Sequence, residues 1–210
     1  MFVSRIRIFA ALMALGATPA HAQTVDAAAT SVAEVSRTDG AINFAKTLTS
    51  DATRILSDEE KTENVRLDEF KSILGDGLAL DAIGNFMLGA SRETITDEQR
   101  ERYDEIFPNY ITTLYAEQFD EIVDKPLEVV DAREISSKDV IVRTQLERKD
   151  DDPILVDWRV RKLSSGEHKA IDIIVSGVSI MIVKREEFAS YIETNGIDAL
   201  LSRLTDEADM

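Results

Sequence analysis

The hydrophobic pattern of this 210-residue chain changes its period at Pro126, and this change constrains the fold more than any other feature. Before Pro126, apolar residues recur every three or four positions, as on one face of a helix. After Pro126 they alternate with other residues through four short runs, which is typical of strands. The alternating positions are Leu127 and Val129, then Val140, Val142 and Leu146, then Val156, Trp158 and Val160, and last Ile171, Ile173 and Val175. Helices followed by strands predict an α+β domain.

Short turn signals separate the four strand runs. Ser136-Ser137, the segment 150–153 and Ser164-Ser165-Gly166 lie between successive runs. Short connections join neighbouring antiparallel strands, so we expect a four-stranded meander. The alternation predicts one packed face and one largely solvated face.

Several helices are predicted before the strands. An apolar stripe begins at Ala41 and continues to Leu56. The segment 57–60 has the form of a capping box and predicts the start of a second helix, which ends at 75–77. The segment 78–88 is apolar on almost every side, so we expect it to be buried or to line an apolar space.

The most regular stripe of the chain follows a second capping box at 96–99. Pro108 lies within it and predicts a kink or a restart of the helix. The spacing places the following residues on one helix face: Tyr103, Ile106, Phe107, Tyr110, Ile111, Leu114, Tyr115, Phe119 and Ile122.

The segment after the fourth strand is ambiguous at 180–183. Its β-branched residues favour a strand, whereas Phe188 and Ile192, four positions apart, favour a helix by the next turn. Asn195-Gly196 ends this element. A last helical stripe contains Ile197, Leu200, Leu201 and Leu204.

The first 22 residues have the layout of a secretory signal peptide. Arg5 and Arg7 precede a short apolar run, and Ala20-His21-Ala22 forms an A-x-A site. We therefore expect export and cleavage after Ala22; the alternative, a membrane anchor, requires a longer apolar run. We expect residues 23–38 to form a flexible leader without an amphipathic period, and residues 39–206 to form a single domain.

Charge and composition exclude several classes of function. Loss of Arg5 and Arg7 with the signal leaves 22 basic against 40 acidic residues, a net charge near −18. Such a surface repels nucleic acid and anionic membranes and favours basic patches on protein partners. Cysteine is absent, and His168 is the single histidine after residue 22, so we expect no disulfide and no zinc site.

Catalytic motifs are also missing from the sequence. There is no G-x-S-x-G, no glycine-rich phosphate loop and too little histidine for a triad. We expect His168 to be exposed beside the turn at Ser164-Ser165-Gly166. Asp172 and Arg185 are candidates for a structural ion pair, and Trp158 for core or pocket wall. These patterns predict a protein that is not an enzyme and uses no cofactor.

Two segments resemble the MlaC/Ttg2D family of periplasmic phospholipid-binding proteins. The C-terminal signature consists of Asp172, Gly177-Val178-Ser179, Arg185, Phe188, Gly196, Leu200 and Leu204. The middle segment contains Leu88-Gly89, Arg92, Thr96, Gln99-Arg100, Phe107 and Tyr115. The chain departs from the family pattern at Ser91, where an aromatic residue is usual, at Tyr103, where Phe is usual, and at Pro108.

The resemblance implies a helix at 180–183 and a cystatin/NTF2-like outline, in which the helices and a curved sheet enclose an apolar pocket. Surplus apolar faces that must be buried together also favour such a pocket. We expect the lipid-binding residues to be Leu80, Ile83, Phe86, Met87, Phe107, Tyr110, Ile111, Leu114, Tyr115, Val156, Trp158 and Ile173. Tyr103, Tyr110 and Tyr115 are candidates for hydroxyls at its mouth.

The family resemblance also implies a function. Its members carry phospholipid between an outer-membrane lipoprotein–porin complex and an inner-membrane ABC transporter with its substrate-binding MCE component, which maintains outer-membrane lipid asymmetry. A hopanoid or another apolar ligand is an alternative cargo. Two further alternatives remain: an NTF2-like enzyme, which requires an acid inside the pocket, and a binding module that works through its acidic surface.

Overall fold

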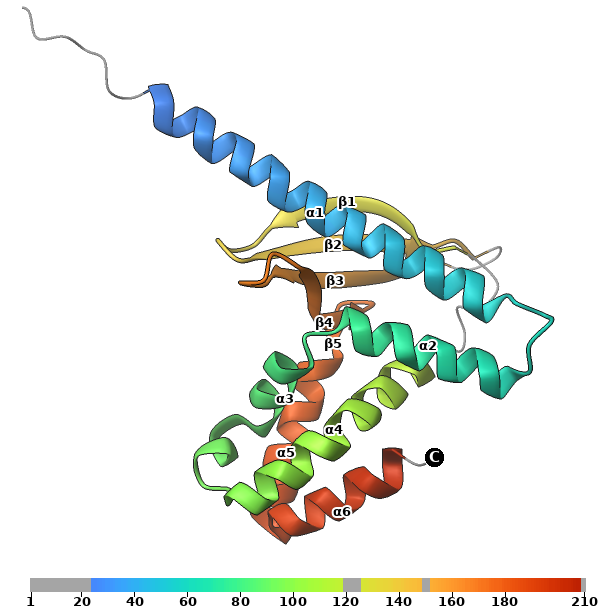
Figure 1. Cartoon of the computed structure of the whole chain (residues 1–210), viewed down its shortest axis with the longest axis vertical. Helices are drawn as coiled ribbons and strands as arrows, with labels where there is room; N and C mark the ends of the chain where they lie inside the picture. The colour runs from blue at the N-terminus through green and yellow to red at the C-terminus, as the bar shows by residue number, and fades with distance from the viewer. Residues whose placement is uncertain (1–23, 119–125, 149–151, 209–210) are drawn as a thin grey trace, which may run out of the picture.

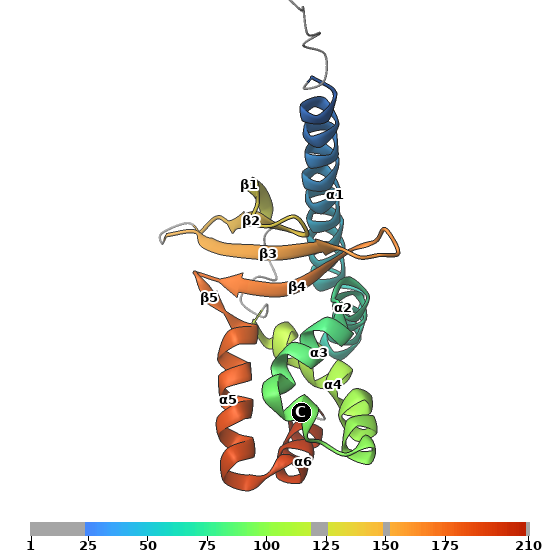
Figure 2. The same cartoon turned by 90° about the vertical axis from the view of Figure 1, so that its left-hand side faces the viewer.

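The computed structural model of the protein describes residues 24–118, 126–148 and 152–208, with side chains from Arg37 onward. One antiparallel sheet in the order β1-β2-β3-β4-β5 forms one part of the molecule. Helix α1 crosses a face of this sheet, and α2 to α6 gather on the side of β4 and β5 (Figures 1 and 2). The predicted α+β class is confirmed, with helices on both sides of the strands in sequence.

The sheet contains the four predicted strands and one more. Its strands are β1 (Glu128–Glu134), β2 (Asp139–Leu146), β3 (Ile154–Lys162), β4 (His168–Val175) and β5 (Val178–Ser179). The sheet therefore has five strands and not the predicted four, because the two-residue β5 was not expected. Ser176 and Gly177 both have positive φ, 48° and 84°, so the chain reverses within two residues and pairs again with β4.

Alternation along the strands separates a packed inner face from a charged outer face. On the inner face Trp158 lies opposite Val142 and Ile173, and all three are at most 2% exposed. On the outer face the Arg143 guanidinium donates two hydrogen bonds, 2.6 and 2.7 Å long, to the Asp157 carboxylate. The predicted packed face is therefore the one turned toward the helices.

Helix α1 (Thr24–Leu56) begins well before the stripe that predicted it. Its described part buries Ala41, Ala45, Leu48 and Ile55 against the sheet and α2. The helix also includes most of the segment 23–38, for which a leader was predicted from the lack of an amphipathic period. Alanine is the strongest helix former, so this Ala-rich segment can be helical without an apolar stripe.

The capping box predicted at 57–60 is wrong, because α2 (Glu63–Gly77) begins at Glu63. The Ser57 hydroxyl donates instead to the Thr53 carbonyl oxygen, 2.7 Å away, and so belongs to the end of α1. The Arg66 guanidinium donates to the carbonyl oxygens of Asp58 and Lys61 and holds the intervening turn. The second capping box is confirmed: the Thr96 and Gln99 side chains each accept the other residue's backbone N–H, at 3.2 and 3.1 Å.

Helix α4 (Asp97–Gln118) follows α3 (Leu80–Leu88) and a short 3-10 turn, η1 (Gly89–Glu93). Pro108 lies inside α4, so the helix does not restart there. Phe107 and Ile111, on either side of Pro108, are at most 2% exposed. Burial of this stripe outweighs the one backbone hydrogen bond that proline removes.

The C-terminal region is helical, as the resemblance implied for 180–183. Helix α5 (Ile180–Asn195) is capped by Ser179, whose hydroxyl accepts the Ile182 backbone N–H at 3.1 Å. Gly196, with φ of 84°, joins it to α6 (Ile197–Ala208). Across the described ranges, none of these helices is both long enough and apolar enough to cross a membrane.

Candidate binding site

The twelve residues predicted to bind lipid belong to one apolar interior. Four come from α3, five from α4 and three from the inner face of the sheet. Nine of the twelve are at most 2% exposed, and Leu80, Phe86 and Leu114 are half-buried against the same core. The structure therefore brings the predicted residues together, although it does so as a packed core.

Aromatic side chains run through this interior from α4 to α5. The Tyr103 ring stacks on Phe107 at 5.0 Å between centroids, Phe107 lies 6.4 Å from Tyr110, and Tyr110 lies 5.8 Å from Phe188. The buried Tyr103 hydroxyl donates to the Gly84 carbonyl oxygen at 3.1 Å. This hydrogen bond holds the Tyr103 side chain in the core. Phe188 completes the series and was missed as a site residue, although its four-residue spacing to Ile192 marked it as a helix position.

Trp158 is fixed at the centre of the inner sheet face. Its indole N–H donates to the Thr144 hydroxyl at 3.0 Å, and that hydroxyl donates to the Val156 carbonyl oxygen at 3.0 Å. Beside Trp158 lies an apolar void of about 20 Å³ between α1, α2 and the sheet. Sequence reasoning missed the other void residues as site residues: Leu48, Thr49, Ala52, Thr53, Leu56, Phe70, Leu74 and Leu127. The 41–56 stripe was the signal that could have found the α1 members.

A second cavity touches the predicted set from the other side of α4. It has a volume of about 250 Å³ and lies among α4, α5 and α6. Tyr110 and Leu114 belong to the predicted set; its other lining residues are Thr113, Glu117, Lys184, Arg203 and Glu207. This cavity is polar, in contrast to the void beside Trp158.

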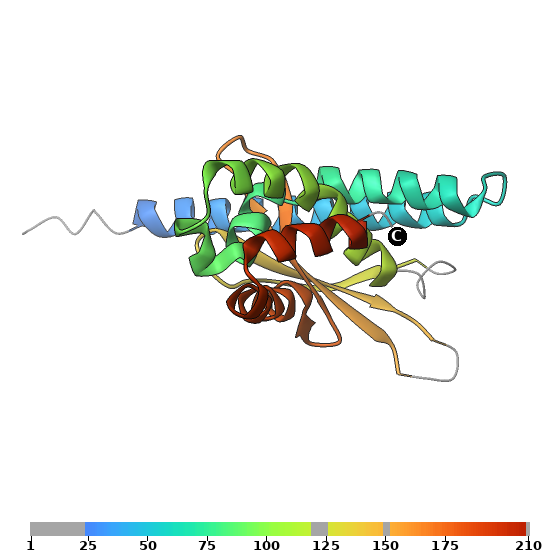
Figure 3. The ribbon, with the colours of Figure 1, turned by 90° about the horizontal axis from the view of Figure 1, so that it is seen from below.

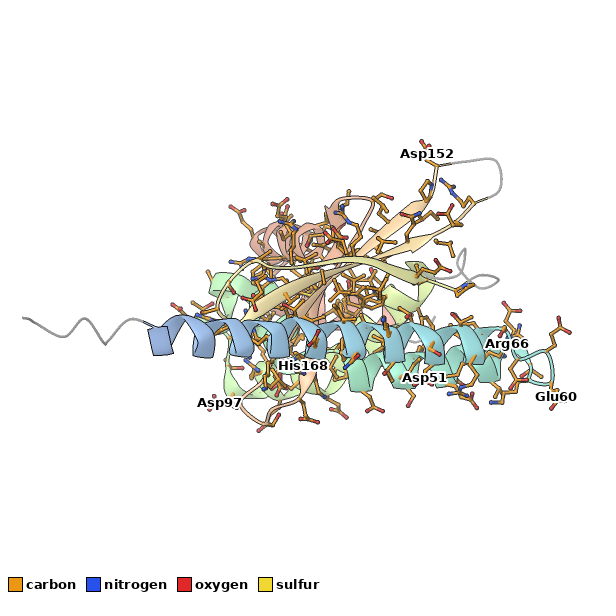
Figure 4. All side chains as sticks on the ribbon, turned by 90° about the horizontal axis from the view of Figure 1, so that it is seen from above. Asp51, Glu60, Arg66, Asp97, Asp152 and His168 are labelled. Atoms are coloured by element: carbon orange, nitrogen blue, oxygen red, sulfur yellow. The ribbon has the colours of Figure 1, made fainter. Side chains whose placement is uncertain are left out.

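A groove of about 560 Å³ runs between α1, α2 and the start of β4 and contains none of the predicted residues. Figure 4 shows two of its residues, Asp51 and His168, along α1. His168 is half-buried against Gly40, so the prediction that it is exposed is wrong. Burial, followed by the charge of Lys162, lowers the pKa of His168 below 6.5.

Asp172 is a buried acid, 2% exposed, at the junction of β4, β5 and α5. One carboxylate oxygen accepts the Ser179 hydroxyl at 2.7 Å, and the other is buried without a partner among the described residues. Burial raises the pKa of Asp172, and hydrogen bonds from Ser179 and the backbone of Met181 and Ile173 oppose that rise. Asp172 lines none of the three cavities described above.

The predicted ion pair between Asp172 and Arg185 does not form within the described part of the chain. The Arg185 guanidinium instead lies 4.3 Å from the centroid of the Phe86 ring. It also lies close to Gly89 at the end of α3, where a cation is favoured by the helix dipole. Arg185 thus ties α5 to α3.

Comparison with known proteins identifies the family. The family model described as MlaC protein matches residues 46–206. The intermembrane phospholipid transport system binding protein MlaC of Haemophilus influenzae is 25% identical over 132 residues, which cover 61% of this chain and 62% of that relative. This match therefore spans less than two thirds of the relative's length.

A solved structure has the same fold. The phospholipid-binding protein from Ralstonia solanacearum, determined in complex with a phospholipid, superposes with a TM-score of 0.67 at 19% identity, over 80% of this chain and 97% of that chain. At this identity the match shows the fold alone. The family match, which extends over most of the sequence, decides the assignment: the chain belongs to the MlaC family.

Proposed function

We propose that this protein is a periplasmic phospholipid carrier that is exported and then loses residues 1–22. The observation that carries the proposal is the meeting of the α4 aromatic stripe with the Val142, Trp158 and Ile173 row in one apolar interior. Membership in the MlaC family and the names of the two relatives support it. The acyl chains lie in this interior, against the twelve predicted residues.

The energetics of burial suit a carrier. Each acyl CH₂ moved out of water contributes roughly 0.8 kcal/mol, so two long chains bind tightly without specific polar contacts. The void beside Trp158 holds about 20 Å³, close to the space of one water molecule and far less than an acyl chain. Loading therefore requires the helices to move away from the inner sheet face, and release requires the same movement.

The proposed partners are an outer-membrane lipoprotein–porin complex and an inner-membrane ABC transporter with its MCE component. Carriage between them maintains outer-membrane lipid asymmetry. The bound phospholipid is cargo, and no catalytic group or cofactor takes part. A hopanoid uses the same apolar interior in the alternative form of the proposal.

Native mass spectrometry of the full protein from a bacterial host tests the proposal. We expect a species heavier by one phospholipid, and phospholipid in a solvent extract of the same sample. Apo protein alone, with no extractable lipid, contradicts carriage. A hopanoid in the extract supports the alternative cargo.

A charge placed in the interior tests whether Leu114 lines the lipid-binding site. Leu114→Asp puts a carboxylate beside the acyl chains, so we expect lipid occupancy to fall several-fold in a protein that still melts cooperatively. Leu67→Asp, at an exposed position on α2, is the matched control and keeps full occupancy. Equal occupancy in the two folded variants shows that Leu114 does not line the site.

Asp172 gives one argument for a second function, an NTF2-like enzyme. Its raised pKa and the nearby buried Tyr115 resemble an acid–base pair, since the charge of Asp172 contributes to raising the pKa of Tyr115 after burial. Loss of a catalytic acid abolishes turnover without emptying the site. If Asp172→Asn keeps its lipid complement unchanged, both by mass and by headgroup, carriage is favoured over chemistry on the lipid.

A further inference from the structure

The polar cavity among α4, α5 and α6 is not needed to hold acyl chains, yet it adjoins the interior that does. Figure 3 shows α6 beside α4, with α5 on the other side of α6. Tyr110 and Leu114 line the cavity and also belong to the predicted lipid-binding set. Its volume of about 250 Å³ is more than ten times that of the void beside Trp158, which is room for a headgroup.

Two cations of the cavity have donors to spare. The Lys184 ammonium donates to Glu187 at 2.9 Å, and the Arg203 Nε–H donates to Glu207 at 2.6 Å. A lysine has three N–H donors and an arginine five, so each ion pair leaves further donors. Phosphate oxygens are the acceptors that such donors bind most strongly.

Thr113 adds a hydroxyl that lacks a partner. The residue is 4% exposed, and its Oγ1 is buried without a hydrogen bond among the described residues. The neighbouring Thr112 hydroxyl, in contrast, donates back to the Pro108 carbonyl oxygen at 2.9 Å. A buried hydroxyl without a partner is costly, and a ligand atom in the cavity would satisfy it.

The cavity combines both signs of charge. Two cations, Lys184 and Arg203, and two carboxylates, Glu117 and Glu207, line it, and Glu187 pairs with Lys184 beside it. The chain as a whole has a net charge of −16. An anionic ligand is repelled by the whole molecule, but a ligand with its own internal charge pair is not. Glu117 is exposed at the edge of the cavity, where it can receive an amine.

We propose that this cavity binds a zwitterionic phosphoester, with its phosphate on Lys184, Arg203 and the Thr113 hydroxyl and its amine toward Glu117. As a lipid headgroup, phosphoethanolamine meets this description, and the cavity then selects among phospholipids. This assignment rests on the proposed phospholipid carriage. The same chemistry in a free phosphoester is the other source of the ligand.

Competition between lipids tests the headgroup. The full protein is incubated with vesicles that contain equal amounts of phosphatidylethanolamine and phosphatidylglycerol with the same acyl chains, and the bound species are counted by native mass spectrometry. We expect a preference for phosphatidylethanolamine of about tenfold, and its loss in Thr113→Val and Arg203→Gln, as one charge-assisted hydrogen bond implies. Arg203→Lys restores part of the preference for phosphatidylethanolamine. Lys46→Gln, an exposed change on α1, leaves that preference intact.

The outcomes distinguish failure of the headgroup site from failure of the proposed phospholipid carriage. Lipid bound by all variants in an unchanged ratio overturns the headgroup site and leaves carriage standing. Thr113→Val removes the unsatisfied hydroxyl and raises the melting temperature if its role is only structural, so a lost preference in that stable variant supports binding.

A second arm uses soluble glycerophosphoethanolamine and NMR. Shifts at Thr113 and Arg203 that vanish in Arg203→Gln support the site even where no lipid loads, and assign it to a free phosphoester. If glycerophosphoethanolamine causes no shifts and the vesicles show no preference, the site is overturned.

Discussion

Two buried aspartates on the outer sheet face have opposite electrostatic surroundings. Asp139 is 1% exposed and accepts two hydrogen bonds each from Arg159 and Arg161, at 2.6 to 3.0 Å. Those bonds outweigh burial, which alone raises the pKa, and hold the pKa of Asp139 below 3.8. Asp172 has a single side-chain donor, Ser179, and its pKa is raised. The same residue type therefore stabilises the fold at one position and costs free energy at the other.

The pH dependence of unfolding distinguishes these aspartates. The raised pKa of Asp172 means that its contribution is most favourable below pH 3.8 and is lost as the pH rises through the folded-state pKa. We expect Asp172→Asn to raise the free energy of unfolding by about 1 kcal/mol at pH 7 and to match the wild type near pH 3. Urea unfolding at several pH values measures the difference.

Asp139→Asn is the matched control for that experiment. The pKa of Asp139 is lowered, so its contribution is present above pH 3.8 and is lost as the pH falls through the folded-state pKa. We expect Asp139→Asn to lower the free energy of unfolding by about 2 kcal/mol at pH 7, since two arginines lose an ionic partner. If both variants shift stability in the same direction at pH 7, the contrast between these sites is wrong.

At the scale of elements, the contact between α1 and β4 depends on a glycine. A Cβ placed on Gly40 would lie 2.4 Å from Cε1 of His168, closer than atoms can approach. A Cβ placed on Gly75, in α2, would lie 3.7 Å from Thr112 Cγ2, an ordinary van der Waals contact. Alanine favours a helix over glycine by about 1 kcal/mol, so packing decides the sign at each site.

We therefore expect opposite effects from two identical substitutions. Gly75→Ala raises the free energy of unfolding by about 0.5–1 kcal/mol, and Gly40→Ala lowers it by about 1–3 kcal/mol because the His168 ring must shift. Combining Gly40→Ala with His168→Ala removes the clash, and the coupling in this double-mutant cycle measures it. A coupling of zero shows that the ring gives way freely.

The His168 ring also makes the α1–β4 contact sensitive to acid. Because its pKa is lowered in the folded protein, His168 takes up a proton more readily in the unfolded chain. Its contribution to stability is therefore complete above pH 6.5 and is lost as the pH falls through the folded-state pKa. We expect the unfolding midpoint in urea to decrease between pH 7 and pH 5, and His168→Gln to reduce that dependence. An unchanged slope in His168→Gln assigns the dependence to other groups.

The elements that sequence predicted are those whose signal is local. The four main strands and α4 repeat their apolar period over enough residues to identify them, and Thr96 with Gln99 forms its cap within one turn. Strand β5 has two residues and depends on the positive φ of Ser176, which no period reveals. The Ser57 motif fits the start of a helix, but a serine can also hydrogen-bond the last turn of a preceding helix. The observed hydrogen bond from Ser57 to the Thr53 carbonyl oxygen assigns Ser57 to the end of α1.

The members of the apolar interior were predictable from the sequence, but its shape was not. A stripe such as Tyr103 to Tyr115 is apolar whether it packs on protein or on lipid, so the sequence identifies the interior and not its openings. The polar cavity unites Thr113, Lys184 and Arg203 from three helices, and their meeting depends on how α5 and α6 pack on α4. Such long-range placement has no period in the sequence.

At the scale of the whole molecule, the proposed carriage requires the closed interior to open. Helix α1 crosses the inner face of the sheet, and the void beside Trp158 lies between α1, α2 and that face. If acyl chains enter there, filling the void must hinder loading without harming the lipid-free fold. Ala52 lines the void from α1 and is the smallest of its residues.

Ala52→Val tests this route of entry. The added methyl groups occupy the void of about 20 Å³, so we expect the melting temperature of lipid-free protein to stay within a few degrees of the wild type while lipid uptake from vesicles slows several-fold. Ala189→Val, at an exposed position in α5, has the same cost in helix propensity and leaves uptake unchanged. Uptake is followed with a fluorescent phospholipid. Equal rates in Ala52→Val and Ala189→Val, with both proteins folded, place the entry of the chains elsewhere than between α1 and the sheet.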